Sequence, residues 1–241
     1  RSRTAAYDWT PAMALEDMNR GGTATAITSI YSGTHLAEHR DAARLARECN
    51  EYAAKMMQDY PARFGMFASL PALDVDATLK EIEYSLDVLK ADGVHLITSY
   101  RNKWLGDPYY EPIFAELHRR RAVLYTHPVV PDFAEKLIPD VPDTVIEIGT
   151  DTTRTIASLL FSGMASKYAN VEIIFSHGGG TLPFLIERFT RLAERPKLAE
   201  RMPHGLLHEV QRFFYDVAQI AYPVPMAALL KLVPLSQVLF G

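Results

Sequence analysis

The sequence predicts one α/β domain over residues 1–241, a (β/α)8 barrel of the TIM type. Short runs rich in β-branched residues alternate with longer segments of helical period, and no low-complexity linker separates them. The 241 residues also lie within the range of length that one such barrel fills. An open Rossmann-type sheet is the alternative, but no G-x-G-x-x-G turn follows an early strand. Strict alternation of strands and helices therefore favours the closed barrel.

Seven segments are expected to form parallel strands. Each is a short run of almost continuous apolar character, as in strands that are covered on both faces. The expected strands are residues 23–30, 64–70, 94–99, 123–127, 171–177 and 213–217, and a seventh opens at 238–240.

Amphipathic helices are expected between these strands. The clearest runs from His35 to Tyr60, where Ala42, Leu45 and Cys49 recur at spacings of three and four. The other helices are expected at residues 11–20, from 79 to about 93, and at 108–121, 152–168, 181–193 and 225–232.

The expected helix at residues 11–20 has no strand before it. A strand before Arg1 would restore the pattern of eight strands and eight helices. The chain also stops at Gly241, soon after its last strand opens. We therefore expect a truncated barrel, in which the first strand and the end of the last strand are absent.

Composition excludes several classes of partner. The net charge of −4 and the pI near 6.1 give no indication of a surface for nucleic acid or an anionic membrane. No apolar run reaches the roughly 18–20 residues that span a bilayer. Cys49 is the single cysteine, which excludes an internal disulfide and a thiolate-rich zinc site and fits a reducing compartment. We expect a cytoplasmic protein whose partner is a small molecule.

Two histidines end successive strands, where barrel enzymes place their catalytic groups. His127 lies in Tyr-Thr-His-Pro and His177 in Phe-Ser-His-Gly-Gly-Gly. Neutral imidazole binds zinc and other divalent cations, so the pair predicts a metal site. The second motif also matches the oxyanion loop of esterases, but the G-x-S-x-G turn that those enzymes need is absent. Gly178, Gly179 and Gly180 are expected instead to let the backbone approach a ligand or a helix N-terminus closely.

Asp216 and Arg154 are candidate substrate-binding residues. Asp216 ends the Phe-Phe-Tyr-Asp-Val-Ala strand, where it either faces the pocket or caps the next turn. Arg154 follows the His127 strand and is expected to bind a substrate carboxylate or to form a surface ion pair. Structural roles are expected for the remaining histidines, which are His35, His39, His95, His118, His204 and His208.

These motifs, in this order and spacing, resemble the decarboxylase branch of the amidohydrolase superfamily. The match rests on Tyr-Thr-His-Pro, Ile-Ile-Phe-Ser-His-Gly-Gly-Gly-Thr-Leu-Pro-Phe, Phe-Phe-Tyr-Asp-Val-Ala and Val-Leu-Phe-Gly. The branch includes aminocarboxymuconate-semialdehyde, γ-resorcylate and 6-methylsalicylate decarboxylases. The early Trp9-Thr10-Pro11 and Thr25-Ala26-Ile27 look most like the 6-methylsalicylate type. The resemblance covers essentially the whole chain.

The resemblance implies roles for individual residues. His127 would be a ligand of Zn2+, Mn2+ or another divalent metal, and His177 would lie beside the metal and act on the bound water or substrate. Arg188 matches an arginine that in some relatives reaches a neighbouring subunit's substrate, so we expect a homodimer. The family's His-x-His or Glu-x-His metal pair and its final aspartate would fall outside residues 1–241, so we expect these residues alone to be inactive.

The reaction that the resemblance implies is metal-dependent, non-oxidative decarboxylation of a small aromatic or dienoic acid. One alternative keeps the site and hydrolyses a lactone or similar small ester with metal-activated water. A second alternative, from another class, is a non-catalytic barrel used for binding or assembly. The two intact histidine motifs argue against that second alternative.

Overall fold

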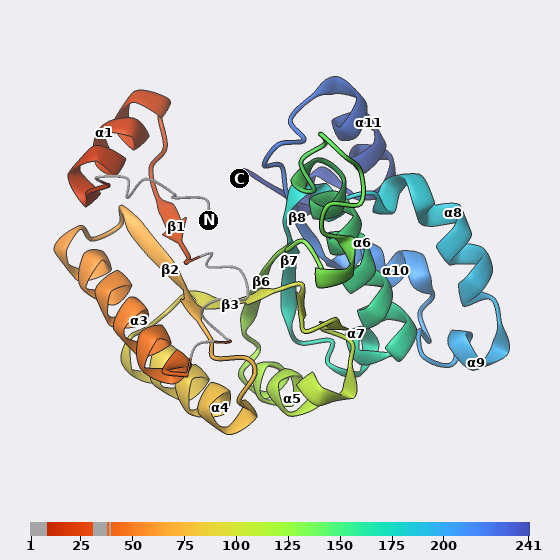
Figure 1. The fold of residues 1–241 in the computed structure, drawn as a ribbon, viewed down its shortest axis with the longest axis horizontal. Helices are drawn as coiled ribbons and strands as arrows, with labels where there is room; N and C mark the ends of the chain where they lie inside the picture. Colours follow the sequence, from red (N-terminus) through yellow and green to blue (C-terminus); the bar gives the residue numbers. More distant parts are fainter. Residues whose placement is uncertain (1–8, 31–37, 39) are drawn as a thin grey trace.

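The computed structural model describes residues 9–30, 38 and 40–241 and contains a seven-stranded parallel sheet. The strand order is β1-β2-β3-β6-β7-β8-β9, so neighbours in the sheet follow one another along the chain. In Figure 1 these strands form an arc, and the helices lie on its outer side. This curled, partly closed barrel confirms the predicted fold class.

Each strand overlaps one of the expected apolar runs, and most of the strands are shorter than that run. All six neighbouring pairs in the sheet are parallel, so the carboxyl ends of the strands lie at one end of the barrel. The strands are β1 (Ala26–Thr28), β2 (Phe64–Ser69), β3 (Gly93–Ile97), β6 (Val123–His127), β7 (Glu172–Phe175), β8 (Phe214–Asp216) and β9 (Val238–Leu239).

The helices begin and end where the local sequence directs. The first starts after Thr10, whose hydroxyl accepts a hydrogen bond from the Met13 amide, and ends before Gly22 in the left-handed region. None of the described helices is long and apolar enough to cross a bilayer. The helices are α1 (Pro11–Gly21), α3 (Ala42–Asp59), α4 (Val75–Glu83), α5 (Glu111–Arg120), α6 (Thr144–Ser162), α7 (Met164–Lys167), α8 (Leu182–Ala193), α9 (Pro196–Ala199), α10 (Leu206–Arg212) and α11 (Pro223–Leu232).

The main hydrophobic core lies between the sheet and this outer layer. Leu96, Leu124 and Ile173 come from three adjacent strands and are fully buried. They belong to one cluster with Phe114 of α5 and Leu160 of α6. Burial of this face leaves the other face of the strands, and their carboxyl ends, to form the interior and mouth of the barrel.

Three expectations about the helices need correction or restriction. The helix expected at 152–168 begins earlier, at Thr144, and ends at Ser162, because Gly163 adopts the left-handed region with φ of 85°. Residues 206–212, where no helix was expected, form α10 and place His208 on a helix. The start of the helix expected from His35, and His39 with it, lies outside the described residues.

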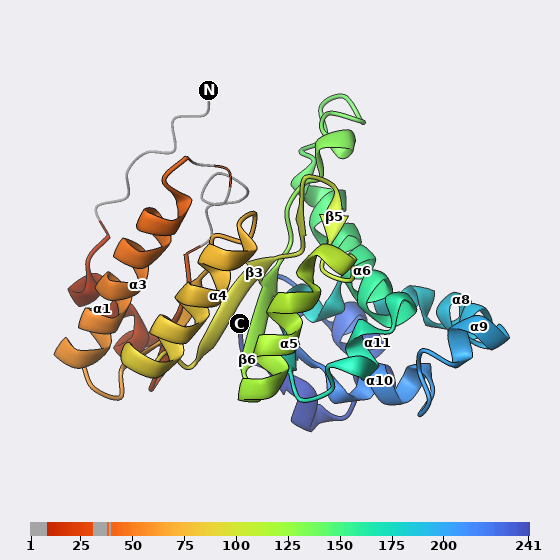
Figure 2. The same ribbon diagram turned by 90° about the horizontal axis from the view of Figure 1, so that it is seen from below.

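A short antiparallel hairpin follows β3 and was not expected. It joins β4 (Ser99–Tyr100) to β5 (Lys103–Trp104). Its two turn residues, Arg101 and Asn102, have φ of 48° and 58°, as a two-residue turn of this hand requires. In Figure 2 the hairpin and the segment that leads into α6 project from the same end of the molecule.

Candidate functional site

The carboxyl ends of β6, β7 and β8 bring three of the sequence-predicted site residues together. His127 is the last residue of β6, His177 follows β7 after Ser176, and Asp216 is the last residue of β8. The two imidazole rings are perpendicular to each other, with centroids 5.3 Å apart. The predicted histidine pair therefore forms a real cluster at the mouth of the barrel.

Main-chain carbonyl groups set the tautomers of both imidazoles. Nδ1 of His127 lies 3.0 Å from the carbonyl oxygen of Pro128, and Nδ1 of His177 lies 2.9 Å from that of Ala218. A carbonyl oxygen only accepts, so Nδ1 donates and Nε2 carries the lone pair in each ring. This is how proteins orient metal-binding histidines. Burial, and then repulsion from His177, lowers the pKa of His127 and favours its neutral form.

Asp216 is buried, and both of its carboxylate oxygens accept hydrogen bonds from other residues of the protein. Oδ1 accepts hydrogen bonds from the amides of His177, at 2.9 Å, and Ala218, at 3.0 Å. Oδ2 accepts one from the hydroxyl of Tyr125 at 3.1 Å. The bond to Ala218 caps the turn after β8, which is the second role that the sequence left open. Asp216 thus acts on the site through His177, and a direct contact with substrate stays a prediction.

The backbone at His177 adopts an uncommon conformation. His177 has φ of 55°, and the three glycines after it also have positive φ. A Cβ on Gly180 would lie 1.9 Å from the carbonyl oxygen of Gly149 in α6. The glycine run therefore allows the loop to pack directly on α6. With the Asp216 bond, this packing holds His177 in its left-handed conformation.

His95 is a further interior histidine that sequence reasoning assigned only a structural role. It is opposite Tyr125 in the β3–β6 pairing, two residues before the Ile97–His127 pair, and its ring lies 5.5 Å from the Tyr125 ring. It is 4% exposed, and its Nε2 has no hydrogen-bond partner among the described residues. Burial, and then repulsion from His127, lowers its pKa to about 4. Residues two apart on a strand point to the same face, so His95 faces the same way as Ile97, which pairs with His127. This spacing was the signal from which the interior position of His95 could have been predicted.

The two candidate arginines lie on helices, Arg154 on α6 and Arg188 on α8. Arg154, on α6, forms an ion pair with Glu147 at 2.9 Å and lies 3.9 Å from Asp151. Its guanidinium also lies over the ring of Phe133, 5.2 Å from the centroid. This is the ion pair that the sequence allowed as the alternative for Arg154. Arg188 is exposed on α8.

The residues that could hold a metal are the two strand-end histidines. Both present an Nε2 lone pair at the barrel mouth, which fits a divalent cation. In the described part of the chain no group of three or more histidine, cysteine, aspartate or glutamate side chains converges to complete a metal centre. The pair therefore accounts for part of a ligand set.

Comparisons with known proteins agree with this geometry. A model of the amidohydrolase family matches residues 2–241. A decarboxylase of Aspergillus niger is 40% identical over 222 residues, which are 87% of this chain and 60% of the relative. A 6-methylsalicylic acid decarboxylase of Penicillium expansum is 40% identical over 204 residues, or 83% and 63% of the two chains. One of Aspergillus aculeatus is 36% identical over 229 residues, or 91% and 69%. The chain thus spans between 60% and 69% of the length of these relatives.

Solved structures show the same fold. An amidohydrolase of 26% identity superposes with a TM-score of 0.89, and the match covers 97% of this chain and 76% of the other. A 2,6-dihydroxybenzoate decarboxylase in complex with 2,6-dihydroxybenzoate gives a TM-score of 0.85 at 21% identity, with the same coverage of 97% and 76%.

Proposed function

This chain belongs to the amidohydrolase family, and we propose that the protein is a metal-dependent, non-oxidative decarboxylase of a small aromatic or dienoic carboxylic acid. The observation that carries the proposal is the pair His127 and His177, whose tautomers are set by main-chain carbonyls at the barrel mouth. The relatives named as 6-methylsalicylic acid decarboxylases support a hydroxybenzoate-type substrate.

His127 would hold a divalent cation through its Nε2, and Nε2 of His177 would lie beside that cation. When bound, the cation supplies positive charge that orients the substrate carboxylate and its neighbouring hydroxyl. A 5-carboxyvanillate decarboxylase of 21% identity is known with manganese, which supports Mn2+ beside Zn2+ as a candidate. Both metals accept imidazole ligands.

His177 is assigned to the reacting end of the substrate. Decarboxylation breaks the bond between the ring and the carboxyl carbon, releases CO2 and places on the ring carbon a proton that comes from water. Because Nδ1 of His177 donates to Ala218, its Nε2 is suited to accept a hydrogen bond, or a proton, from a substrate hydroxyl. Asp216 holds the His177 main chain while this happens. As part of the proposal, Asp216 and Arg154 also contact the substrate directly. Arg188 would contact the substrate of a second subunit.

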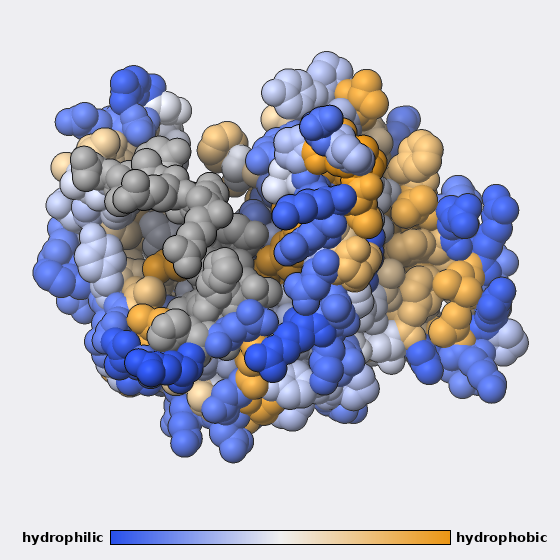
Figure 3. Space-filling model, viewed as in Figure 1, coloured by the Kyte–Doolittle hydropathy of each residue, from blue (hydrophilic) through white to orange (hydrophobic). Residues whose placement is uncertain are grey.

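A homodimer is proposed as well. Figure 3 shows apolar surface concentrated over α6, α8 and α11, whereas the outer ends of α8 and α9 are hydrophilic. Phe184 on α8 is 90% exposed and Val224 on α11 is 81% exposed. A contiguous apolar patch, unlike a single exposed apolar side chain, is typical of a surface that binds another protein. Arg188 lies one helical turn after Phe184, where it would reach a second copy.

The proposed activity is tested by CO2 release. The full-length protein, loaded with Zn2+ or Mn2+, is given a panel of hydroxybenzoates led by 6-methylsalicylate, and in parallel a panel of small lactones. We expect CO2 release that a chelator abolishes and that His177→Ala loses. Lactone hydrolysis without CO2 release from a folded, metal-loaded protein would contradict the decarboxylase.

A further inference from the structure

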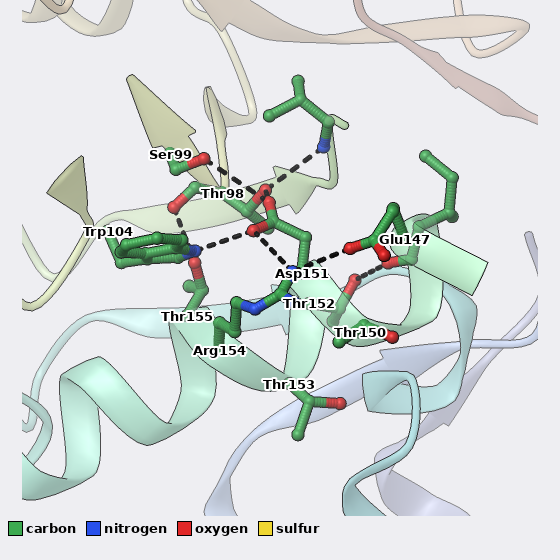
Figure 4. Close-up of polar contacts among 12 residues, drawn as sticks. Thr98, Ser99, Trp104, Glu147, Thr150, Asp151, Thr152, Thr153, Arg154 and Thr155 are labelled. Carbon is green, nitrogen blue, oxygen red and sulfur yellow. Dashed lines mark hydrogen bonds and ion pairs between the residues drawn. The ribbon is translucent and has the colours of Figure 1, made fainter. Parts of the chain in front are cut away.

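A second buried carboxylate lies at the same end of the barrel as the histidine pair, and the mechanism above does not use it. Asp151, on α6, has no exposed surface. Figure 4 shows it at the centre of a polar cluster built from α6, the β4–β5 hairpin and the end of β3. A carboxylate in such a position costs free energy to bury unless its oxygens are hydrogen-bonded.

Donors surround the Asp151 carboxylate. The indole Nε1–H of Trp104 donates to Oδ1 at 2.7 Å, and the hydroxyl of Thr98 donates to Oδ2. Ser99 lies 3.5 Å from Oδ2, and the Arg154 guanidinium lies 3.9 Å from Oδ1. Burial raises the pKa of Asp151, and the bonds from Thr98 and Trp104 oppose that change. Every one of these neighbours stabilises the ionised form.

Thr98 connects this carboxylate to the strand end that carries His127. Its main-chain amide donates to the His127 carbonyl oxygen at 3.0 Å. Its hydroxyl oxygen accepts a hydrogen bond from the Val129 amide at 3.3 Å. The His127 ring in turn bonds the Pro128 carbonyl at 3.0 Å. Thr98 therefore holds the chain on both sides of the bond that orients the imidazole, and Asp151 holds Thr98.

We propose that Asp151 is a positioning residue, which fixes the direction of the His127 imidazole through Thr98. The inference rests on the proposed function, since it takes His127 as a metal ligand. Outer hydrogen-bond partners of metal-binding histidines commonly change metal affinity when they are replaced. The same carboxylate also accepts the hydrogen bond from Trp104, which links the β4–β5 hairpin to α6. Asp151 therefore positions both the hairpin and the strand end that carries His127.

Asparagine at position 151 preserves size but not the pattern of acceptors. Trp104 can only donate, so the amide oxygen must face it, and the amide NH2 then faces Thr98. The Thr98 hydroxyl, which already accepts from Val129, would lose the charge-assisted bond that it donates to the carboxylate and could only accept a weaker bond from the amide NH2. Valine at position 98 removes the hydroxyl altogether, whereas serine keeps it. These substitutions separate hydrogen bonding at Thr98 from side-chain volume.

The test is the affinity of the full-length protein for Mn2+, measured by calorimetry, with thermal unfolding as the check on folding. Asp151→Asn and Thr98→Val are expected to weaken Mn2+ binding about tenfold, and Thr98→Ser to restore it. Glu209→Gln is the matched control, because Glu209 is 2% exposed and also accepts from a hydroxyl, Ser166, and an arginine, Arg212, but lies on α10.

The outcomes distinguish this inference from the proposed function. His127→Ala must lose Mn2+ affinity, and a wild-type affinity in that variant would overturn the metal-ligand role itself. Loss in His127→Ala together with full affinity in Asp151→Asn and Thr98→Val would overturn the positioning role alone. An equal loss in Glu209→Gln would also overturn it, because the effect would then follow from general destabilisation.

Discussion

The main-chain amide of His177 donates a hydrogen bond of 2.9 Å to Oδ1 of Asp216, which joins the ends of β7 and β8. The same oxygen accepts from the Ala218 amide, and the Ala218 carbonyl accepts from the His177 ring. Asp216 thus orients both the backbone and, through the turn that it caps, the imidazole of His177. Because Asp216 acts through these hydrogen bonds, its role as an acceptor can be tested separately from its negative charge.

We predict that Asp216→Asn is mild and Asp216→Ala is severe. The asparagine oxygen keeps the two amide bonds, and the Tyr125 hydroxyl turns to accept from the new NH2. Alanine leaves the His177 amide buried without a partner, which costs about 1–3 kcal/mol of unfolding free energy. Urea unfolding and kcat for CO2 release are the measurements. Equal losses in the two variants would mean that the charge of Asp216 itself is needed.

His95 predicts an acid-sensitive component of stability. Its pKa is about 4 in the folded protein, against 6.5 ordinarily, so the unfolded chain takes up this proton first as the pH falls. The contribution of neutral His95 to the free energy of unfolding is fully present above pH 6.5, and about 3 kcal/mol of it is lost as the pH falls to 4. Urea unfolding at both pH values should show a smaller pH dependence in His95→Gln. The exposed His208→Gln is the control, and an unchanged pH dependence in His95→Gln would refute the prediction.

Gly180 is predicted to tolerate no side chain. Its φ is 66°, and a Cβ would overlap the Gly149 carbonyl oxygen at 1.9 Å, so Gly180→Ala must displace the loop from α6. We expect a loss of about 3 kcal/mol or more in unfolding free energy. Gly22→Ala, at φ of 71° with no atom within 4 Å, is the control and should lose about 1 kcal/mol. Similar losses in the two variants would show that the contact with α6 is unimportant.

The proposed homodimer predicts that a charge at Phe184 dissociates it. Phe184 is 90% exposed, so Phe184→Glu should leave folding unaffected. In the dimer the new carboxylate would be buried without a partner, so association should be lost. Light scattering after size-exclusion chromatography gives the mass of wild type and variant. Val88→Glu, at a side chain that is 60% exposed and distant along the chain, should leave the mass unchanged. A wild-type dimer that Phe184→Glu leaves intact would assign the interface to another surface.

The strands and the histidine pair were predictable because their signals are local. A buried parallel strand is recognised from a short apolar run in the sequence. A histidine at the carboxyl end of such a strand lies at the barrel mouth, because all the strands end there. The 99–104 hairpin was not predictable, because Arg101 and Asn102 adopt a left-handed turn that their types do not demand. Asp151 and His95 were missed for another reason. Their importance lies in partners more than 25 residues away, such as Thr98 for Asp151 and Tyr125 for His95.

A direct test of the proposed decarboxylation follows the proton that enters the substrate ring. The full-length, metal-loaded protein would be given 6-methylsalicylate in D2O and the product examined by NMR, with His177→Ala alongside. We predict chelator-sensitive release of CO2 and one deuterium on the carbon that carried the carboxyl group, both much reduced in the variant. Consumption of substrate without CO2 release would contradict the decarboxylase, and equal CO2 release by His177→Ala would contradict the role of His177.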